Sequence, residues 1–191
     1  MAPKLILTGF MATGKSVVAR ALARRLGWRL LDCDAEIVKR AGKPIPEIFR
    51  RDGEAHFRAL ERAVIADVAN ERRRCPQCSN PLPAVVATGG GAIVDQANFA
   101  ALDRAGVIVC LVARPEVIAK RVGPSAKSRP MLRQGGKPLK QRIAELIAER
   151  SEAYRRAPLS VDTSDLNIEQ VADTVLSAFA VYGREKWAAS A

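Results

Sequence analysis

The chain has 191 residues, a formal net charge of +11 at pH 7 and only 5% aromatic residues. This length suits one domain with a full hydrophobic core, whereas no apolar run approaches the about 18 residues of a membrane span, and four irregularly spaced cysteines do not suggest a disulfide framework. Scarce aromatics and scattered basic residues argue against a nucleic-acid-binding protein, so we expect an enzyme whose positive charge attracts anionic substrates. The segment MAPKLILTG lacks a long apolar signal core, so we expect a cytoplasmic protein.

Apolar runs alternate with helical patterns along the chain, which is typical of an α/β fold with a parallel sheet. We predict strands at Lys4–Thr8, Arg29–Leu31, Ala84–Ala87, Val107–Val112 and Leu159–Val161. We predict helices over 15–26, 33–41, 46–51, 54–71, 95–104, 115–122, 138–156 and 168–181. The last ten residues, 182–191, are expected to form a weakly attached tail.

The first predicted strand leads into GFMATGKS, at 9–16, which has the spacing of a phosphate-binding loop. Gly9 and Gly14 permit a backbone whose N–H groups converge on phosphate oxygens. Lys15 adds a positive charge for the β- and γ-phosphates, and the Ser16 hydroxyl can ligate Mg²⁺. The alternative is a chance match in a glycine turn, but the strand before the motif and the helix after it favour nucleotide binding.

The second predicted strand is followed by Asp32 and Asp34, at the edge where ligands of open α/β sheets bind. Alternate residues of an extended segment point the same way, so both carboxylates could face one site. One could hold the hydration shell of Mg²⁺ while the other accepts a hydrogen bond from a substrate hydroxyl. The alternative is that Asp34 caps the next helix.

Two later motifs flank further helices. Arg58 lies within reach of Glu54 and Glu61 on the helix 54–71, where an ion pair at the surface would be worth little. The strand at Ala84–Ala87 is followed by three glycines, Gly89–Gly91, which would let another molecule approach the backbone. A tight turn is the alternative explanation, although one or two glycines normally suffice for a turn.

The segment 123–137, GPSAKSRPMLRQGGK, follows neither the helical nor the strand period. A long polar loop inside a compact domain is usually functional or disordered. A phosphoryl-transfer enzyme must exclude water from the transferring group, so we interpret this segment as a mobile lid. A loop that is merely flexible is the alternative.

Taken together, these motifs resemble the shikimate kinase family of small P-loop kinases, from Lys4 to about Ala180. The matching segments are GFMATGKS, LLDCD, IPEIFRRDGEAHFRALE, ATGGGA, SRPML and ERSEAYRRA. The resemblance implies a single three-layer αβα domain, 1–191, with a five-stranded parallel sheet. It also implies substrate-binding helices over about 33–62 and a lid over about 123–137.

The resemblance assigns ATP, with Mg²⁺, to one group of residues. Lys15 would contact the phosphates, Ser16 and Asp32 would hold Mg²⁺, and Arg129 would reach the phosphates when the lid closes. Arg121 resembles an arginine that stacks on adenine. The full nucleotide set is Ala12, Thr13, Gly14, Lys15, Ser16, Val17, Arg121 and Arg129.

The resemblance assigns shikimate to a second group. Asp34 would bind the ring hydroxyls and deprotonate the attacking 3-hydroxyl, which makes it catalytic together with Lys15 and Arg129. Arg58 and Arg150 would grip the substrate carboxylate, for which bidentate guanidinium groups are suited. Gly89, Gly90 and Gly91 would present backbone to the substrate.

Three features depart from the family pattern. Ala12 replaces a usual glycine, which is conservative if the position does not need a positive φ. No arginine or proline stands near Leu166, so an adenine contact there is doubtful. An insertion before the third strand carries Cys75 and Cys78, half a zinc site by spacing, while Cys33 and Cys110 are expected to be buried small residues. We interpret the insertion as a tolerated surface segment.

The predicted activity is therefore transfer of a phosphoryl group from ATP to shikimate. We expect the protein to be a monomer. Another small-molecule kinase, such as a gluconate kinase, is the nearest alternative. A GTPase-type switch would need an Asn-Lys-x-Asp motif, which the sequence lacks. A shikimate-kinase-like binding module without turnover also stays open, and only an assay can decide that point.

Overall fold

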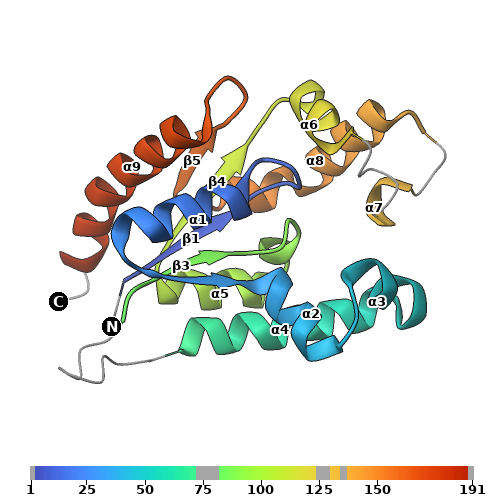
Figure 1. Ribbon diagram of the computed structural model, residues 1–191, viewed down its shortest axis with the longest axis horizontal. Helices are drawn as coiled ribbons and strands as arrows, with labels where there is room; N and C mark the ends of the chain where they lie inside the picture. Colours follow the sequence, from blue (N-terminus) through green and yellow to red (C-terminus); the bar gives the residue numbers. More distant parts are fainter. Residues whose placement is uncertain (1–2, 72–81, 124–129, 134–136, 189–191) are drawn as a thin grey trace.

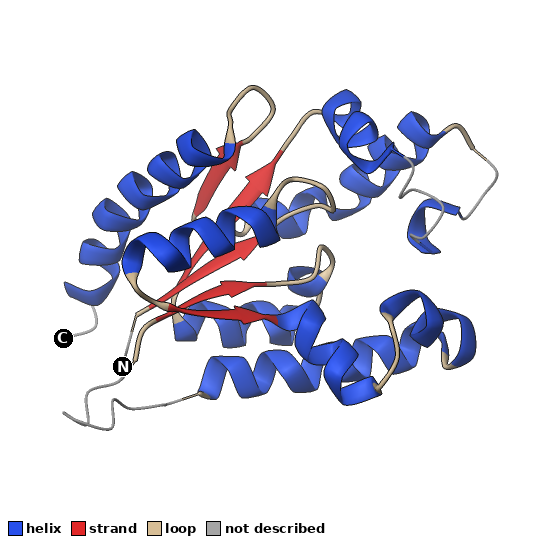
Figure 2. Cartoon of the chain, viewed as in Figure 1, coloured by secondary structure: helices blue, strands red, loops and turns tan. Residues whose placement is uncertain are grey.

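The computed structural model describes residues 3–71, 82–123, 130–133 and 137–188. Its strands are β1 (Lys4–Thr8), β2 (Arg29–Asp32), β3 (Ala84–Ala87), β4 (Val107–Val112) and β5 (Leu159–Asp162). Its α-helices are α1 (Lys15–Leu26), α2 (Cys33–Ala41), α3 (Ile45–Arg51), α4 (Gly53–Asn70), α5 (Gln96–Ala105), α6 (Pro115–Val122), α7 (Pro130–Arg133), α8 (Leu139–Arg155) and α9 (Ile168–Ala188), and Ala92–Val94 form the 3₁₀ turn η1 (Figures 1 and 2). Except at the end of α9, each predicted strand and helix begins and ends within one residue of its prediction.

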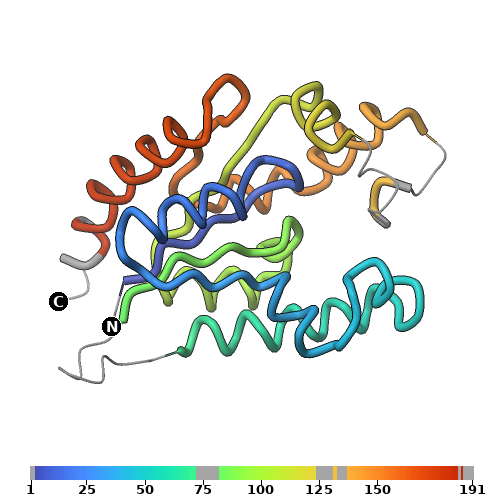
Figure 3. Tube along the Cα trace, viewed as in Figure 1, coloured from blue at the N-terminus to red at the C-terminus, as the bar shows by residue number. Residues whose placement is uncertain are grey.

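The strands form one five-stranded parallel sheet in the order β2-β3-β1-β4-β5. Helices α1 and α9 cover one face, and α4, α5 and α8 cover the other, which confirms the three-layer architecture (Figure 3). Strand β1 shows why: Leu5 and Leu7 pack with α1 and α9, while Ile6 points to the opposite layer. Among the described helices, none has the length and apolar character that crossing a membrane requires.

The loop between β1 and α1 approaches its neighbours too closely for ordinary side chains. A Cβ at Gly9, where φ is 123°, would overlap the carbonyl oxygen of Leu111. Gly14 has a φ of 98° and sits at the N-cap of α1. Ala12 also has a positive φ, 61°. Alanine in place of the family's usual glycine is therefore not a conservative change at this position. An L-residue in this conformation is strained.

Ala12→Gly is therefore expected to stabilise the protein. Glycine avoids the strain of an L-residue in the left-handed conformation, which stabilises the folded state by about 1–2 kcal/mol. The greater conformational freedom of glycine in the unfolded chain offsets about 0.4–1 kcal/mol of this gain. The free energy of unfolding in urea should rise by about 0.5–1 kcal/mol. A lower value would show that the alanine methyl packs favourably enough to outweigh the backbone strain.

The prediction of a weakly attached tail from residue 182 is wrong for the described residues. Helix α9 continues to Ala188. The Lys186 ammonium donates to the Asp103 carbonyl at 2.6 Å, to the Asp103 carboxylate at 2.7 Å and to the Gly106 carbonyl at 2.9 Å. These bonds tie the end of α9 to the end of α5, a contact between distant segments that local composition does not reveal.

Candidate active site

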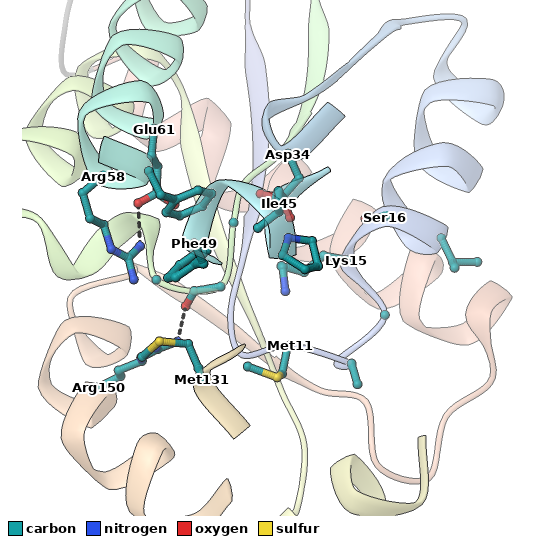
Figure 4. Close-up of a pocket in the computed structure, with 18 residues that line it drawn as sticks. Met11, Lys15, Ser16, Asp34, Ile45, Phe49, Arg58, Glu61, Met131 and Arg150 are labelled. Carbon is teal, nitrogen blue, oxygen red and sulfur yellow. Dashed lines mark hydrogen bonds and ion pairs between the residues drawn. The ribbon is translucent and has the colours of Figure 1, made fainter. Parts of the chain in front are cut away.

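A cavity of about 500 Å³ opens at the carboxyl edge of the sheet, within the range of small-molecule sites. Its walls come from the phosphate loop, α2, α3, α4, the glycine triplet, α7 and α8 (Figure 4). It brings together the predicted residues Ala12, Gly14, Lys15, Ser16, Val17, Asp34, Arg58, Gly89, Gly90, Gly91 and Arg150. The lining does not include Thr13, Asp32 or Arg121. Arg129, Cys75 and Cys78 lie outside the described residues.

The phosphate loop is braced from within. The Phe10 carbonyl accepts the Thr13 hydroxyl at 2.8 Å and the Lys15 ammonium at 2.8 Å. The N-cap of α1 is Gly14, which has no side chain to accept a hydrogen bond from the first N–H groups of the helix. These N–H groups therefore have no side-chain cap at Gly14 that would compete with a ligand. A helix N-terminus of this kind, with Lys15 and Ser16 in the same wall of the cavity, is suited to phosphate.

The two aspartates after β2 have different environments. Strand β2 runs one residue further than predicted, and α2 begins directly at Cys33. Asp32 is the N-cap of α2, and its Oδ1 accepts the Ala35 N–H at 3.1 Å. Asp34 is in the first helical turn, where it lines the cavity. The cap of α2 is thus Asp32 and not Asp34. Strand alternation does not bring the two carboxylates to one site, because Asp32 has an extended backbone whereas Asp34 is helical.

Arg58 and Glu61 form an ion pair in the cavity wall. This pair is more deeply buried than the surface pair expected from sequence. Arg58 Nη1 and Glu61 Oε2 are 2.7 Å apart, and the Glu61 side chain is only 2% exposed. The other oxygen, Oε1, has no hydrogen-bond partner in the described part of the chain. Burial raises the pKa of Glu61, while the neighbouring Arg58 guanidinium opposes that rise. Arg58 also contacts Glu54 at 3.1 Å.

Glu61 was missed as a site residue at the level of sequence. The signal was its position three residues after Arg58 on the apolar side of α4, where a carboxylate needs a partner. In the structure it converges with Asp34 on the glycine triplet: a Cβ at Gly89 would lie 2.7 Å from Glu61 Oε1 and 3.0 Å from Asp34 Oδ1. At Gly91, a Cβ would lie 2.9 Å from Arg58 Nη1. The glycines therefore make room for functional side chains and are more than a turn.

Arg150 reaches the cavity from α8, opposite α4 (Figure 4). Only 8% of the residue is exposed. Its guanidinium lies 5.7 Å from the centre of the Phe10 ring and donates to the Gly90 carbonyl at a long 3.4 Å. Within the described ranges, no carboxylate forms an ion pair with it. The Arg150 charge is felt by the buried Glu61 carboxylate, but a buried guanidinium that no carboxylate contacts directly favours an anionic ligand.

Tyr154, one helical turn after Arg150, is a second residue that sequence reasoning missed. Its hydroxyl donates to the Gly90 carbonyl at 2.6 Å. Burial raises the pKa of this phenol to about 12, so it is a donor at neutral pH. In a trans peptide the C=O and the next N–H point in opposite directions. The bond to the Gly90 carbonyl therefore fixes the direction of the N–H of Gly91, the residue whose Cα side faces the Arg58 guanidinium.

Tyr154→Phe should consequently weaken the arginine side of the cavity. Loss of one neutral hydrogen bond to a buried carbonyl is worth about 1–1.5 kcal/mol, so the KM of the substrate bound there should rise about five- to tenfold. The KM for ATP should change by less than about twofold, because the phosphate loop keeps its contacts. Tyr182→Phe, on α9 and away from the cavity, is the matched control. Equal increases in both KM values would indicate a general structural role instead.

The remaining predicted residues are placed as follows. Arg121, at the end of α6, donates to the hydroxyl of Thr163 at 2.9 Å and to its carbonyl at 2.6 Å. Cys33 and Cys110 are buried free thiols, as expected. Burial raises the pKa of Cys110 to about 12 and that of Cys33 still further, which makes both unreactive.

Comparison with known proteins identifies the family through its sequence model, its relatives and a solved structure. The sequence model of the family described as shikimate kinase matches residues 11–180. A shikimate kinase of Geobacter metallireducens is 44% identical over 87% of this chain and 86% of its own length. One of Thermoanaerobacter pseudethanolicus is 36% identical over 92% and 95%. The solved shikimate kinase of Acinetobacter baumannii in complex with shikimate superimposes with a TM-score of 0.84 at 31% identity, covering 95% of each chain. The chain belongs to the shikimate kinase family.

Proposed function

We propose that this chain transfers the γ-phosphoryl group of ATP to the 3-hydroxyl of shikimate, giving shikimate 3-phosphate and ADP. One observation carries the substrate assignment. Arg150, buried and without an ion pair in the described residues, shares the cavity with Arg58. Two guanidinium groups from separate helices suit a carboxylate. Asp34, in the same cavity, suits the hydroxyls of the ring that bears that carboxylate.

The nucleotide side follows from the phosphate loop. Lys15 neutralises phosphate charge, and the N–H groups at the start of α1 bind phosphate oxygens. Ser16 and Asp32 offer the hard oxygen atoms that Mg²⁺ prefers, and a carboxylate acting through water fits an ion that keeps much of its hydration shell. Among the described residues, Asp32 uses only its Oδ1, which accepts the Ala35 N–H, so the chemistry of these residues fits this ion. When bound, Mg²⁺ would neutralise charge on the phosphates.

Catalysis is then mainly positioning and removal of a proton. Arg58 and Arg150 fix the carboxylate, which orients the ring so that its 3-hydroxyl faces the phosphate loop. Asp34 accepts the hydroxyl proton as the new oxygen–phosphorus bond forms. We also propose the roles expected for Arg129, which would stabilise the transferring charge, and for Arg121, which would contact adenine.

The decisive experiment is ADP release with a panel of hydroxy acids that includes shikimate and gluconate. We expect turnover with shikimate and none above background with gluconate. Preference for gluconate would favour the alternative small-molecule kinase. Shikimate binding without ADP release would favour the non-catalytic binding module, and the intact Lys15 and Asp34 argue against that outcome.

A further inference from the structure

A chain of hydrogen bonds joins the segment after β5 to the phosphate loop. Thr163 follows β5 and is 2% exposed. Its hydroxyl lies 3.1 Å from the Thr13 carbonyl oxygen, and it accepts a bond from Arg121 Nη1 at 2.9 Å. Thr13 is itself 1% exposed and donates its hydroxyl to the Phe10 carbonyl. Residues 150 positions apart in the sequence thus meet directly beneath the loop.

Arg121 sets the direction of this chain. A guanidinium can only donate, so the Thr163 oxygen acts as acceptor toward Arg121 and its single proton must point elsewhere. Two carbonyls are within reach, Thr13 at 3.1 Å and Val112 at 3.2 Å. The Val112 carbonyl already accepts the backbone N–H of Thr163 at 2.9 Å. The Thr13 carbonyl is therefore the better acceptor for the hydroxyl proton.

The bond to Thr13 determines where the next N–H points. Because a trans peptide directs its C=O and N–H to opposite sides, turning the Thr13 carbonyl toward Thr163 turns the Gly14 N–H away from it. Gly14 lines the cavity and begins α1 with a φ of 98°. Because glycine reaches positive and negative φ with similar ease, a bond to the preceding carbonyl helps to select this conformation.

We propose that Thr163 is a positioning residue for phosphate binding: its hydroxyl, polarised by Arg121, holds the Thr13–Gly14 peptide so that the Gly14 N–H faces the phosphates. The inference rests on the proposed function in that the loop binds ATP. It differs from an adenine contact, because Thr163 acts on the loop backbone and touches no base. It also gives Arg121 a second task, orienting Thr163.

The test compares Thr163→Val, which keeps the shape and removes the hydroxyl, with Thr163→Ser, which keeps the hydroxyl. The Kd of ADP, measured by calorimetry with Mg²⁺, and the KM for ATP should rise about tenfold in the valine variant and less than about threefold in the serine variant. The KM for shikimate should stay within about twofold in both. The Kd of GDP should rise by the same factor as that of ADP, because the effect is on the phosphates.

Thr8→Val is the matched control, since Thr8 is fully buried beside the same loop and its hydroxyl has no partner in the described residues. It should leave the Kd of ADP within about twofold. If Thr163→Val fails to fold, Thr163→Cys, with its weak donor, replaces it and should show the same split. Three results would overturn the inference. The Kd of ADP could be unchanged in Thr163→Val, the affinity for ADP could fall while that for GDP does not, or Thr163→Ser could bind ADP as weakly as Thr163→Val. Failure of the unmodified protein to bind ADP would instead refute the proposed function.

Discussion

Asp34→Asn is expected to lower kcat by about 10²–10⁴-fold, the usual contribution of a positioned general base. The amide keeps the size of the carboxylate but cannot accept the hydroxyl proton. Asp34 is not the cap of α2, so the substitution should leave helix formation intact. The Kd of ADP and the midpoint of thermal unfolding should therefore match those of the unmodified protein. Single-turnover phosphate transfer to shikimate is the direct measurement.

Asp32→Asn is the matched control for this experiment. Asparagine caps helices about as well as aspartate, so the bond to the Ala35 N–H should survive and stability should be kept. The change should instead raise the Mg²⁺ concentration needed for half-maximal activity, as expected for a ligand of the metal's water shell. A near-normal kcat for Asp34→Asn would refute its role as the base. A shared Mg²⁺ effect would place both carboxylates at the metal.

The fold could be predicted because its elements follow local rules. Continuous apolar runs such as Val107–Val112 predict strands buried on both faces, and the structure buries this strand in both layers. Where sequence reasoning failed, a distant partner decided the outcome. The end of α9 is held by Lys186 on Asp103 and Gly106, which lie 80 or more positions away. No composition of the last residues could reveal that anchor.

The site divides in the same way. The phosphate loop could be predicted from a contiguous motif with a physical reason for each position. Arg150 could be selected from neighbouring arginines only through the family resemblance, because its burial depends on packing between helices. Glu61, Tyr154 and Thr163 were missed because each acts on a backbone or side chain that the fold alone brings near. The geometry of Gly90, for example, depends on a tyrosine 64 positions later.

Arg58→Ala should have two separable effects, on substrate binding and on stability. Loss of a charge-assisted contact to a carboxylate should weaken shikimate by about 2–4 kcal/mol, read as kcat/KM for shikimate with the KM for ATP as reference. It also leaves the buried Glu61 carboxylate without its partner. Because Arg58 remains a quarter exposed, the fold should lose about 2 kcal/mol, less than the about 3–5 kcal/mol of a fully buried pair.

The pH dependence separates the two effects. Burial raises the pKa of Glu61 from its ordinary value of 4.5, and removing Arg58 takes away the larger of the two positive charges that oppose this rise, the other being Arg150. A carboxyl group whose pKa is higher in the folded state is harmless while protonated in both states and destabilising once the unfolded chain ionises. The stability deficit of Arg58→Ala should therefore grow as the pH rises above about 4.5.

Adding Glu61→Gln to Arg58→Ala should restore much of the stability and remove the pH dependence of the deficit, because the buried carboxylate at position 61 is gone. Shikimate binding should not return, since the guanidinium is still missing. Arg150→Ala should weaken shikimate as strongly as Arg58→Ala with a smaller loss of stability, because Arg150 has no ion pair among the described residues. The measurements are urea unfolding from pH 4 to 8 and steady-state kinetics. If the double variant regained shikimate affinity, Arg58 would serve only to neutralise Glu61, and the carboxylate would be bound by Arg150 alone.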